Sequence, residues 1–157
     1  MSFPEKVYTG KELKEARALI EQGYKHQLNV EGKSEFTRKV KEAIEHIKTA
    51  GYYDYLTTYI RNITEIDGMT QLRQSEVAIW ANKFAVDNPV DAASLFIQKA
   101  FSMQEYLAGK LYYGGAAEKR SIAKRIMFLE ALKQKTTDAS IKEECDRLLG
   151  LWNDSSL

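Results

Sequence analysis

The sequence predicts an all-α, single-domain fold, a compact bundle of about seven helices with a central helix near residues 89–112. Apolar residues recur at spacings of three and four along most of the 157-residue chain, as they do in amphipathic helices. No segment alternates apolar and polar residues for long enough to predict a strand. Nine Gly and two Pro are too few for a turn-dense β-sandwich.

The first three predicted helices occupy about residues 11–29, 34–50 and 52–66. Thr9 followed by Glu12 forms a capping box, which opens the first helix. Gly51 provides the left-handed residue that ends the second. Apolar side chains with helical spacing continue from there to a turn at residues 67–68.

The other four predicted helices follow at about residues 70–85, 89–112, 116–135 and 138–152. Asn88 and Pro89 form the sharpest boundary, because Asn is a good helix cap and Pro loses no hydrogen bond at the first helical position. The helix after them is apolar around most of its circumference, as a central helix must be. The ends of the chain, residues 1–8 and 153–157, are expected to be frayed.

Charged residues are distributed unevenly along the chain. Residues 51–109 carry four basic and seven acidic side chains, whereas residues 1–50 carry ten and eight and residues 110–157 carry nine and seven. Because burying a charge costs free energy, the charge-poor middle is predicted to supply most of the core. The net charge of +1 generates no global attraction to nucleic acid or anionic membranes.

The sequence predicts a cytoplasmic protein that does not contact membranes. The first residues lack the apolar run of a signal peptide. No stretch approaches the roughly 20 apolar residues that span a bilayer. A single cysteine, Cys145, excludes an internal disulfide framework and is consistent with a reducing compartment.

The sequence contains no motif for metal, cofactor or nucleophilic chemistry. Neither His26 nor His46 follows a Glu by three residues, as the ligands of di-iron helical bundles do. The zinc motifs HExxH and CxxC are absent. Cys145 lies on the apolar stripe of its predicted helix, where inert packing is the expected role. We therefore predict no metal and no cofactor, and we favour a non-catalytic protein while leaving catalysis open.

Tyrosine usage predicts an interaction surface. On a helix, Tyr53 and Tyr55 are expected to point away from Tyr52, so these rings cannot all be buried on one face. Tyr is enriched at protein interfaces, since it combines a large apolar ring with a polar tip. With Tyr112 and Tyr113, these residues form the predicted interface of a protein-binding or self-associating module. The alternative is that the rings pack on their own bundle.

A different function, an enzyme or a small polar ligand binder, is indicated by charged residues around the predicted turn at residues 67–68. Paired carboxylates and arginines suit acid–base chemistry or polar ligands. The same groups also suit a structural ion-pair network, because a covered cation needs a carboxylate partner. The candidate ligand-binding residues are Arg61, Glu65, Asp67, Arg73, Glu76 and Trp80.

Nucleic-acid binding through the predicted helix 116–135 is the second alternative. Residues 110–135 carry seven basic and two acidic side chains, and phosphate backbones bind to such stripes. The closest group of cations is Lys119, Arg120, Lys124 and Arg125. No groove-reading motif accompanies them, and the acidic helix that follows can neutralise them, so the sequence disfavours this function.

Overall fold

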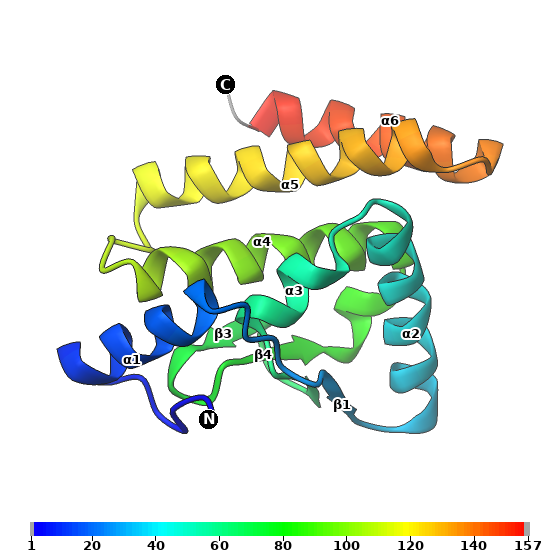
Figure 1. Cartoon of the computed structure of the whole chain (residues 1–157). Helices are drawn as coiled ribbons and strands as arrows, with labels where there is room; N and C mark the ends of the chain where they lie inside the picture. Colours follow the sequence, from blue (N-terminus) through cyan, green and yellow to red (C-terminus); the bar gives the residue numbers. More distant parts are fainter. Residues whose placement is uncertain (1, 156–157) are drawn as a thin grey trace.

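The fold is mostly helical but contains a small β-sheet. The computed structural model describes residues 2–155 of the chain. Within them the order of elements is α1 (Gly10–Glu21), β1 (Asn29–Glu31), α2 (Ser34–Thr49), α3 (Tyr53–Tyr59), β2 (Asn62–Ile66), β3 (Gln71–Arg73), the short 3₁₀ helix η1 (Gln74–Glu76), β4 (Ala78–Asn82), the 3₁₀ helix η2 (Lys83–Val86), α4 (Pro89–Leu107), α5 (Gly115–Lys135) and α6 (Ala139–Ser155) (Figure 1).

The prediction of an all-α fold is therefore wrong in the middle of the chain and near residue 29. The first predicted helix, 11–29, ends at Glu21, and residues 29–31 form β1. The predicted helix 52–66 ends at Tyr59 and continues as β2. The predicted helix 70–85 is instead β3, η1, β4 and η2. Six α-helices form within the described residues, where about seven were predicted.

The misread segments are strands because their apolar side chains lie on one face of a sheet. Ile63 and Ile79 are neighbours in the register of β2 and β4, and both are fully buried. Thr64 and Trp80, one residue further along, pair on the opposite face and are half-buried. This alternation over a few residues is a strand pattern, and the β-branched side chains favour it over a helix.

The sheet has the strand order β1-β2-β4-β3. Strands β1, β2 and β4 are parallel neighbours, and β3 is antiparallel to β4. Helices α2 and α3 form the connection between β1 and β2, because a parallel pair needs a crossover. Both β1 and β3 are edge strands of this sheet.

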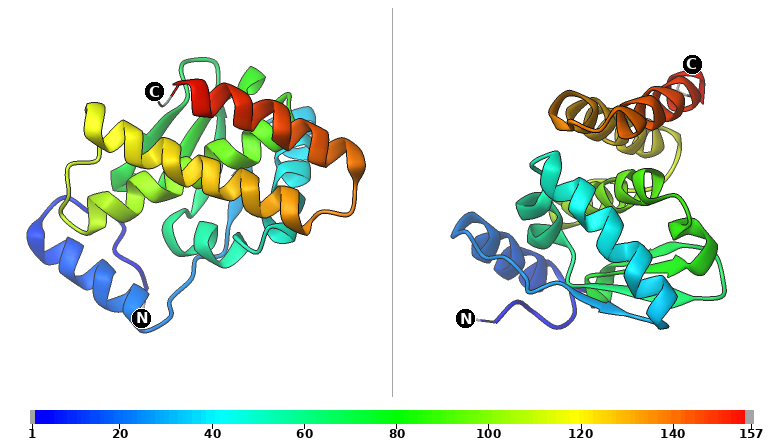
Figure 2. Two further views of the ribbon diagram at one scale, coloured as in Figure 1. Left: turned by 90° about the horizontal axis from the view of Figure 1, so that it is seen from above. Right: turned by 90° about the vertical axis from the view of Figure 1, so that its right-hand side faces the viewer.

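Helix α4 occupies the centre of the molecule, as predicted. It contacts α1, α2, α3, α5, α6, β3 and η2, and it lies between the sheet and the α5–α6 pair (Figures 1 and 2). The Asn88 side chain accepts hydrogen bonds from the backbone N–H groups of Val90 and Asp91, both at 3.0 Å, which confirms the predicted cap. The helix ends at Leu107, earlier than the predicted boundary near residue 112.

The core does not follow the prediction drawn from the charge distribution, which expected most of it in the middle of the chain. Of the 33 buried hydrophobic side chains among the described residues, 16 lie between residues 51 and 109, just under half, and the rest come from the charge-rich flanks. Phe3 and Val7 also belong to the core, although residues 1–8 were expected to be frayed. At the other end α6 continues to Ser155, and residues 156–157 of the expected frayed tail lie outside the described residues.

No helix within residues 2–155 is both long enough and apolar enough to cross a bilayer.

Candidate functional site

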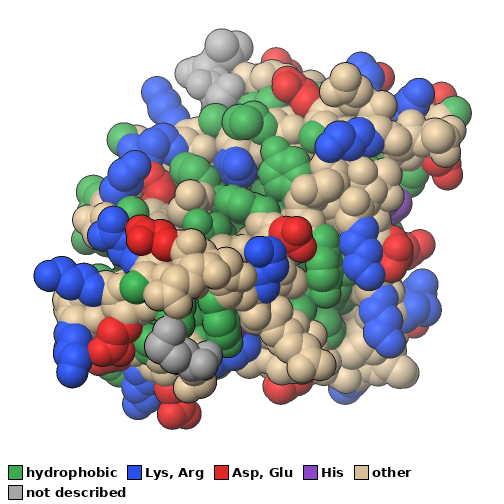
Figure 3. Space-filling model, viewed as in Figure 1, with side chains coloured by type: hydrophobic (Ala, Val, Ile, Leu, Met, Phe, Trp, Pro, Cys, Tyr) green, Lys and Arg blue, Asp and Glu red, His purple; other side chains and the backbone are tan. Residues whose placement is uncertain are grey.

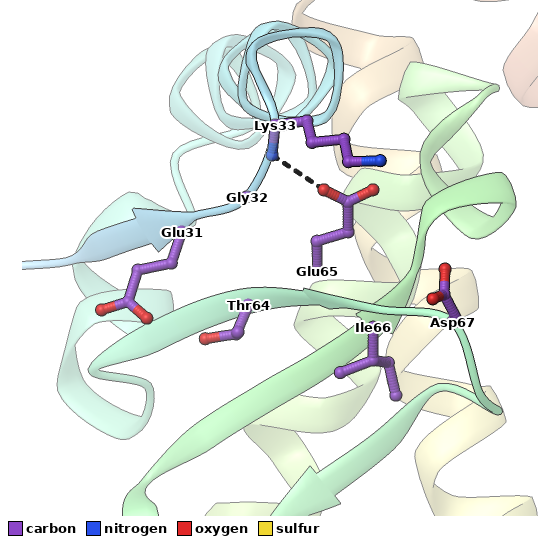
Figure 4. A pocket seen from close by; sticks show the side chains of 7 residues that line it. All are labelled: Glu31, Gly32, Lys33, Thr64, Glu65, Ile66 and Asp67. Atoms are coloured by element: carbon purple, nitrogen blue, oxygen red, sulfur yellow. Dashed lines mark hydrogen bonds between the residues drawn. The ribbon is translucent and has the colours of Figure 1, made fainter.

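A hollow of about 370 Å³ opens at the carboxyl ends of β1 and β2, beside the start of α2 (Figure 4). Ligands of open α/β sheets commonly bind outside the carboxyl ends of parallel strands, so this is the first place to look for a polar site. The hollow is lined by Glu31, Gly32, Lys33, Thr64, Glu65, Ile66 and Asp67.

Glu65 already occupies the position at which an anion would bind. Its Oε1 accepts a hydrogen bond of 2.8 Å from the backbone N–H of Lys33, at the N-terminus of α2 (Figure 4). A helix N-terminus attracts negative charge and has unpaired N–H groups, and the Lys33 side chain does not cap it. Glu65 therefore caps α2, and an anionic ligand would have to displace it.

Close packing around Glu65 depends on Gly32. A Cβ atom at position 32 would lie 2.8 Å from Glu65 Oε1 and 2.7 Å from Phe36 Cδ2. Both distances are shorter than van der Waals contact, so a side chain at this position cannot coexist with the present arrangement. The glycine and the carboxylate thus form one structural unit that joins β1, β2 and α2.

The other charged residues of the predicted cluster do not converge on this hollow, although Asp67 lies at its rim. Asp67 Oδ1 lies 3.8 Å from Lys83 Nζ, at the same end of the sheet. Arg61 lies at the opposite end of β2, where its Nη2 donates a hydrogen bond of 3.0 Å to the backbone carbonyl of Glu76. The polar residues around the predicted turn are therefore separated by the length of a strand.

Arg73 and Trp80 lie on adjacent strands, β3 and β4. The Arg73 guanidinium carbon is 4.3 Å from the centre of the Trp80 ring, a cation–π contact. Arg73 Nη1 also donates a hydrogen bond of 3.3 Å to Gln71 Oε1. The Arg73 guanidinium therefore contacts the Trp80 ring and the Gln71 side-chain amide. The carboxylate partner that the sequence predicted for Arg73 is not among these contacts.

The four tyrosines between residues 52 and 59 are divided between two surfaces. Tyr52, Tyr55 and Tyr59 lie on one face of α3, with ring centres 6.0 and 5.2 Å apart in succession. The expectation that Tyr55 points away from Tyr52 is therefore wrong, because spacings of three and four place helical residues on the same side. Tyr53 is separate, with Lys48 Nζ 5.0 Å from its ring centre.

The Tyr52 and Tyr55 rings pack on the molecule itself. Tyr52 contacts the Phe128 ring edge-on at 5.4 Å, and the Tyr55 hydroxyl donates a hydrogen bond of 2.6 Å to Gln104 Oε1. Burial raises the pKa of Tyr55. Figure 3 shows hydrophobic side chains along the middle of this face, between α5 and α3. These half-buried rings mainly join α3 to α4 and α5.

Tyr106 near the end of α4 and Tyr112 and Tyr113 in the α4–α5 loop form a second cluster, in which half-buried and exposed rings are combined. Tyr112 lies between Tyr106 and Tyr113, at 5.2 Å from each ring centre. The Tyr106 hydroxyl donates a hydrogen bond to the Val7 carbonyl, which brings Tyr8 to the same place. We call Tyr8, Tyr106, Leu111, Tyr112 and Tyr113 the tyrosine patch.

The sequence predicted Tyr112 and Tyr113 but missed Tyr8 and Leu111. The predicted helix 89–112 includes Leu111 and Tyr112, but α4 stops at Leu107, and the run Leu111–Tyr112–Tyr113 lies in the α4–α5 loop. Three consecutive large apolar residues in a loop indicate an exposed apolar surface. Tyr8 is brought to the patch by the hydrogen bond between Tyr106 and its neighbour Val7. These two residues are 99 positions apart, so no local pattern predicts the position of Tyr8.

The basic residues of α5 are used largely within the fold. Arg120 Nε lies 2.7 Å from Oε2 of the buried Glu105. Lys124 Nζ lies 4.5 Å from the Tyr55 ring centre. Arg125 is buried and lies 2.7 Å from Asp91. Three of the four predicted cations thus contact other parts of the protein, which leaves little of the stripe available to a phosphate backbone.

Within residues 2–155, no group of three or more His, Cys, Asp and Glu side chains is placed to hold a metal ion. No protein-family model matches the chain, and no curated protein or solved structure is significantly similar to it.

Proposed function

We propose that the protein is a non-catalytic interaction module that binds a protein, either a partner or a second copy of itself, through the tyrosine patch. The observation that carries this proposal is the exposure of Tyr8, Leu111 and Tyr113, which are 61%, 60% and 64% accessible. Scattered apolar residues on a surface are ordinary, but a contiguous group is typical of interaction sites.

The construction of the patch also supports a binding role. Tyr106 and Tyr112 connect the exposed residues to α4 and to the N-terminal segment through ring contacts and the bond to Val7. Aromatic anchors held on a rigid scaffold lose little conformational entropy on binding. Lys6, whose Nζ lies 5.5 Å from the Tyr8 ring centre, gives the patch a polar rim.

The proposal is tested by replacing the two exposed loop residues, Leu111→Ser together with Tyr113→Ser. Sedimentation velocity over a range of concentrations measures self-association, and affinity capture followed by mass spectrometry measures partner binding. The double variant is expected to lose at least tenfold in affinity, since truncating interface anchors costs about 1–2 kcal/mol each. Circular dichroism checks that it remains folded.

Phe84→Ser is the matched control, because Phe84 is 69% exposed but lies on η2, outside the patch. This variant should associate as the wild type does. The proposal fails if the double variant and the control retain the same oligomeric state and the same partners as the wild type.

A further inference from the structure

Strand β1 has an open edge. In the register of β1 with β2, the backbone N–H of Asn29 donates to the Arg61 carbonyl at 2.9 Å. Successive residues of a strand direct their backbone groups to opposite sides. Asn29 and Glu31 therefore face β2, and the N–H and carbonyl of Val30 face the outer edge, where the described sheet has no further strand. Open strand edges of this kind can pair with another chain.

A groove of about 460 Å³ runs beside this edge, between β1, α2 and the start of α3. Its apolar lining consists of Leu28 and Val30 from the strand side and Ile44 and Tyr53 from the helices. The side chains of a strand added at the edge would alternate between the two faces of the sheet. The side chain opposite Val30 would therefore lie on the same face as Val30 and enter the groove.

The charges at the rim of the groove favour an acidic occupant. Glu45 lies 3.6 Å from Lys48, and Glu42 lies 4.0 Å from Arg38, so both carboxylates already have cationic partners. Lys41 is exposed and forms no ion pair or hydrogen bond with any residue in the described part of the chain. The unpaired charge on this rim is therefore positive.

We propose that the β1 edge binds an extended, acidic segment of another protein as a fifth strand of the sheet. The Val30 N–H and carbonyl form main-chain hydrogen bonds with the added strand. An apolar side chain opposite Val30 fills the groove beside Ile44 and Tyr53, and an acidic residue pairs with Lys41. This site does not depend on the tyrosine patch, which lies at the α4–α5 loop and the N-terminal segment.

The test uses a fluorescein-labelled synthetic peptide in which valine alternates with threonine between glutamates at both ends. Fluorescence polarisation measures its affinity for the full chain. Three comparisons isolate the features of the proposed site. A peptide with lysines in place of the glutamates tests charge, a peptide N-methylated at alternate amides tests the main-chain bonds, and the variant Lys41→Glu tests the rim.

The acidic peptide is expected to bind at least fivefold more tightly than the basic one. Lys41→Glu should reduce or reverse this preference, by about threefold to fivefold for an exposed ion pair. The control Lys14→Glu, at an exposed position on α1, should leave the preference unchanged. N-methylation should weaken binding more than tenfold, because a strand cannot pair without its N–H groups.

The proposal is overturned if the N-methylated and unmodified peptides bind equally, or if Lys41→Glu and Lys14→Glu have the same effect. It is also overturned if the chain dimerises through this edge in the absence of peptide, since the occupant is then a second copy. That result would appear in sedimentation as a dimer. Val30→Pro would dissociate this dimer, whereas the double variant of the tyrosine patch, Leu111→Ser with Tyr113→Ser, would leave it intact.

Discussion

Arg125 Nη2 lies 2.7 Å from Asp91 Oδ1, and this ion pair between a buried guanidinium and a half-buried carboxylate joins α5 to the first turn of α4. The remaining donors of the guanidinium are also used. Nε donates to Ser94 Oγ at 2.8 Å and Nη1 donates to Gln98 Oε1 at 2.7 Å. The Trp152 ring of α6 lies against the guanidinium, with its centre 4.2 Å from the central carbon. One side chain therefore connects three helices.

The first prediction follows from this arrangement. Arg125→Met should lower the free energy of unfolding by about 2–4 kcal/mol, because it removes a buried cation that donates four hydrogen bonds and leaves Asp91, Ser94 and Gln98 without this partner. Urea denaturation measures the change. Lys133→Met, in the exposed pair with Asp146, is the control and should leave the stability nearly unchanged. An equal effect of the two variants would contradict the structural role of Arg125.

His26 is buried between aromatic rings at the N-terminal segment. Its ring centre lies 4.5 Å from that of Phe3 and 5.1 Å from that of Tyr24, and its Nε2 has no hydrogen-bond partner among the described residues. Burial, together with the positive charge of Arg61, lowers the pKa of His26 from 6.5 to about 4. Protonation of this residue therefore opposes folding.

The second prediction is a loss of stability between pH 6.5 and about pH 4. In this window the unfolded chain binds a proton at His26 and the folded chain does not, so the free energy of unfolding falls as the pH falls. The loss from this residue amounts to about 3 kcal/mol and levels off below the folded pKa. Denaturation at a series of pH values measures it, with His26→Leu as the comparison. A pH dependence that is the same in both proteins would refute the assignment.

Cys145 supplies the third prediction. Its side chain is fully buried in the core, and burial raises its pKa to about 11, with Asp146 and Glu144 acting in the same direction. At about pH 8 the native thiol should therefore react with a disulfide reagent roughly 100-fold more slowly than in the unfolded chain. Absorbance of the released thiolate measures the rate with and without guanidinium chloride. Rapid reaction of the native protein would show that Cys145 is accessible.

Capping signals in the sequence predicted three helix boundaries correctly, whereas the helices expected to reach residues 29 and 112 end at Glu21 and Leu107. Thr9 accepts a hydrogen bond from the Glu12 N–H, Asn88 caps α4, and Gly51 has a positive φ of 80° after α2, all as expected. Each of these depends on residues within one turn of each other. The position of the tyrosine patch was partly predictable for the same reason, because Tyr112 and Tyr113 are adjacent.

The sheet was missed because Ile60 and Ile63 are spaced as they would be on a helix. Strand pairing depends on residues far apart in the chain, and no local signal separates a short strand of this kind from a helical turn. The error also misplaced the charged cluster. Arg61 and Glu65 would lie about 6 Å apart along a helix axis, but four residues of strand separate them by about 13 Å. They therefore lie at opposite ends of β2.

The final prediction concerns Gly32, which gives Glu65 access to the N-terminus of α2. Gly32→Ala should lower the free energy of unfolding by about 1–3 kcal/mol, because the added Cβ overlaps Glu65 and Phe36. Gly150→Ala is the matched control. Gly150 lies within α6, and a Cβ there meets nothing within 4 Å, so this change should stabilise the protein by about 0.5–1 kcal/mol. Urea denaturation of both variants measures the contrast, and a Gly32→Ala protein as stable as the wild type would show that Glu65 does not need this close approach to cap the helix.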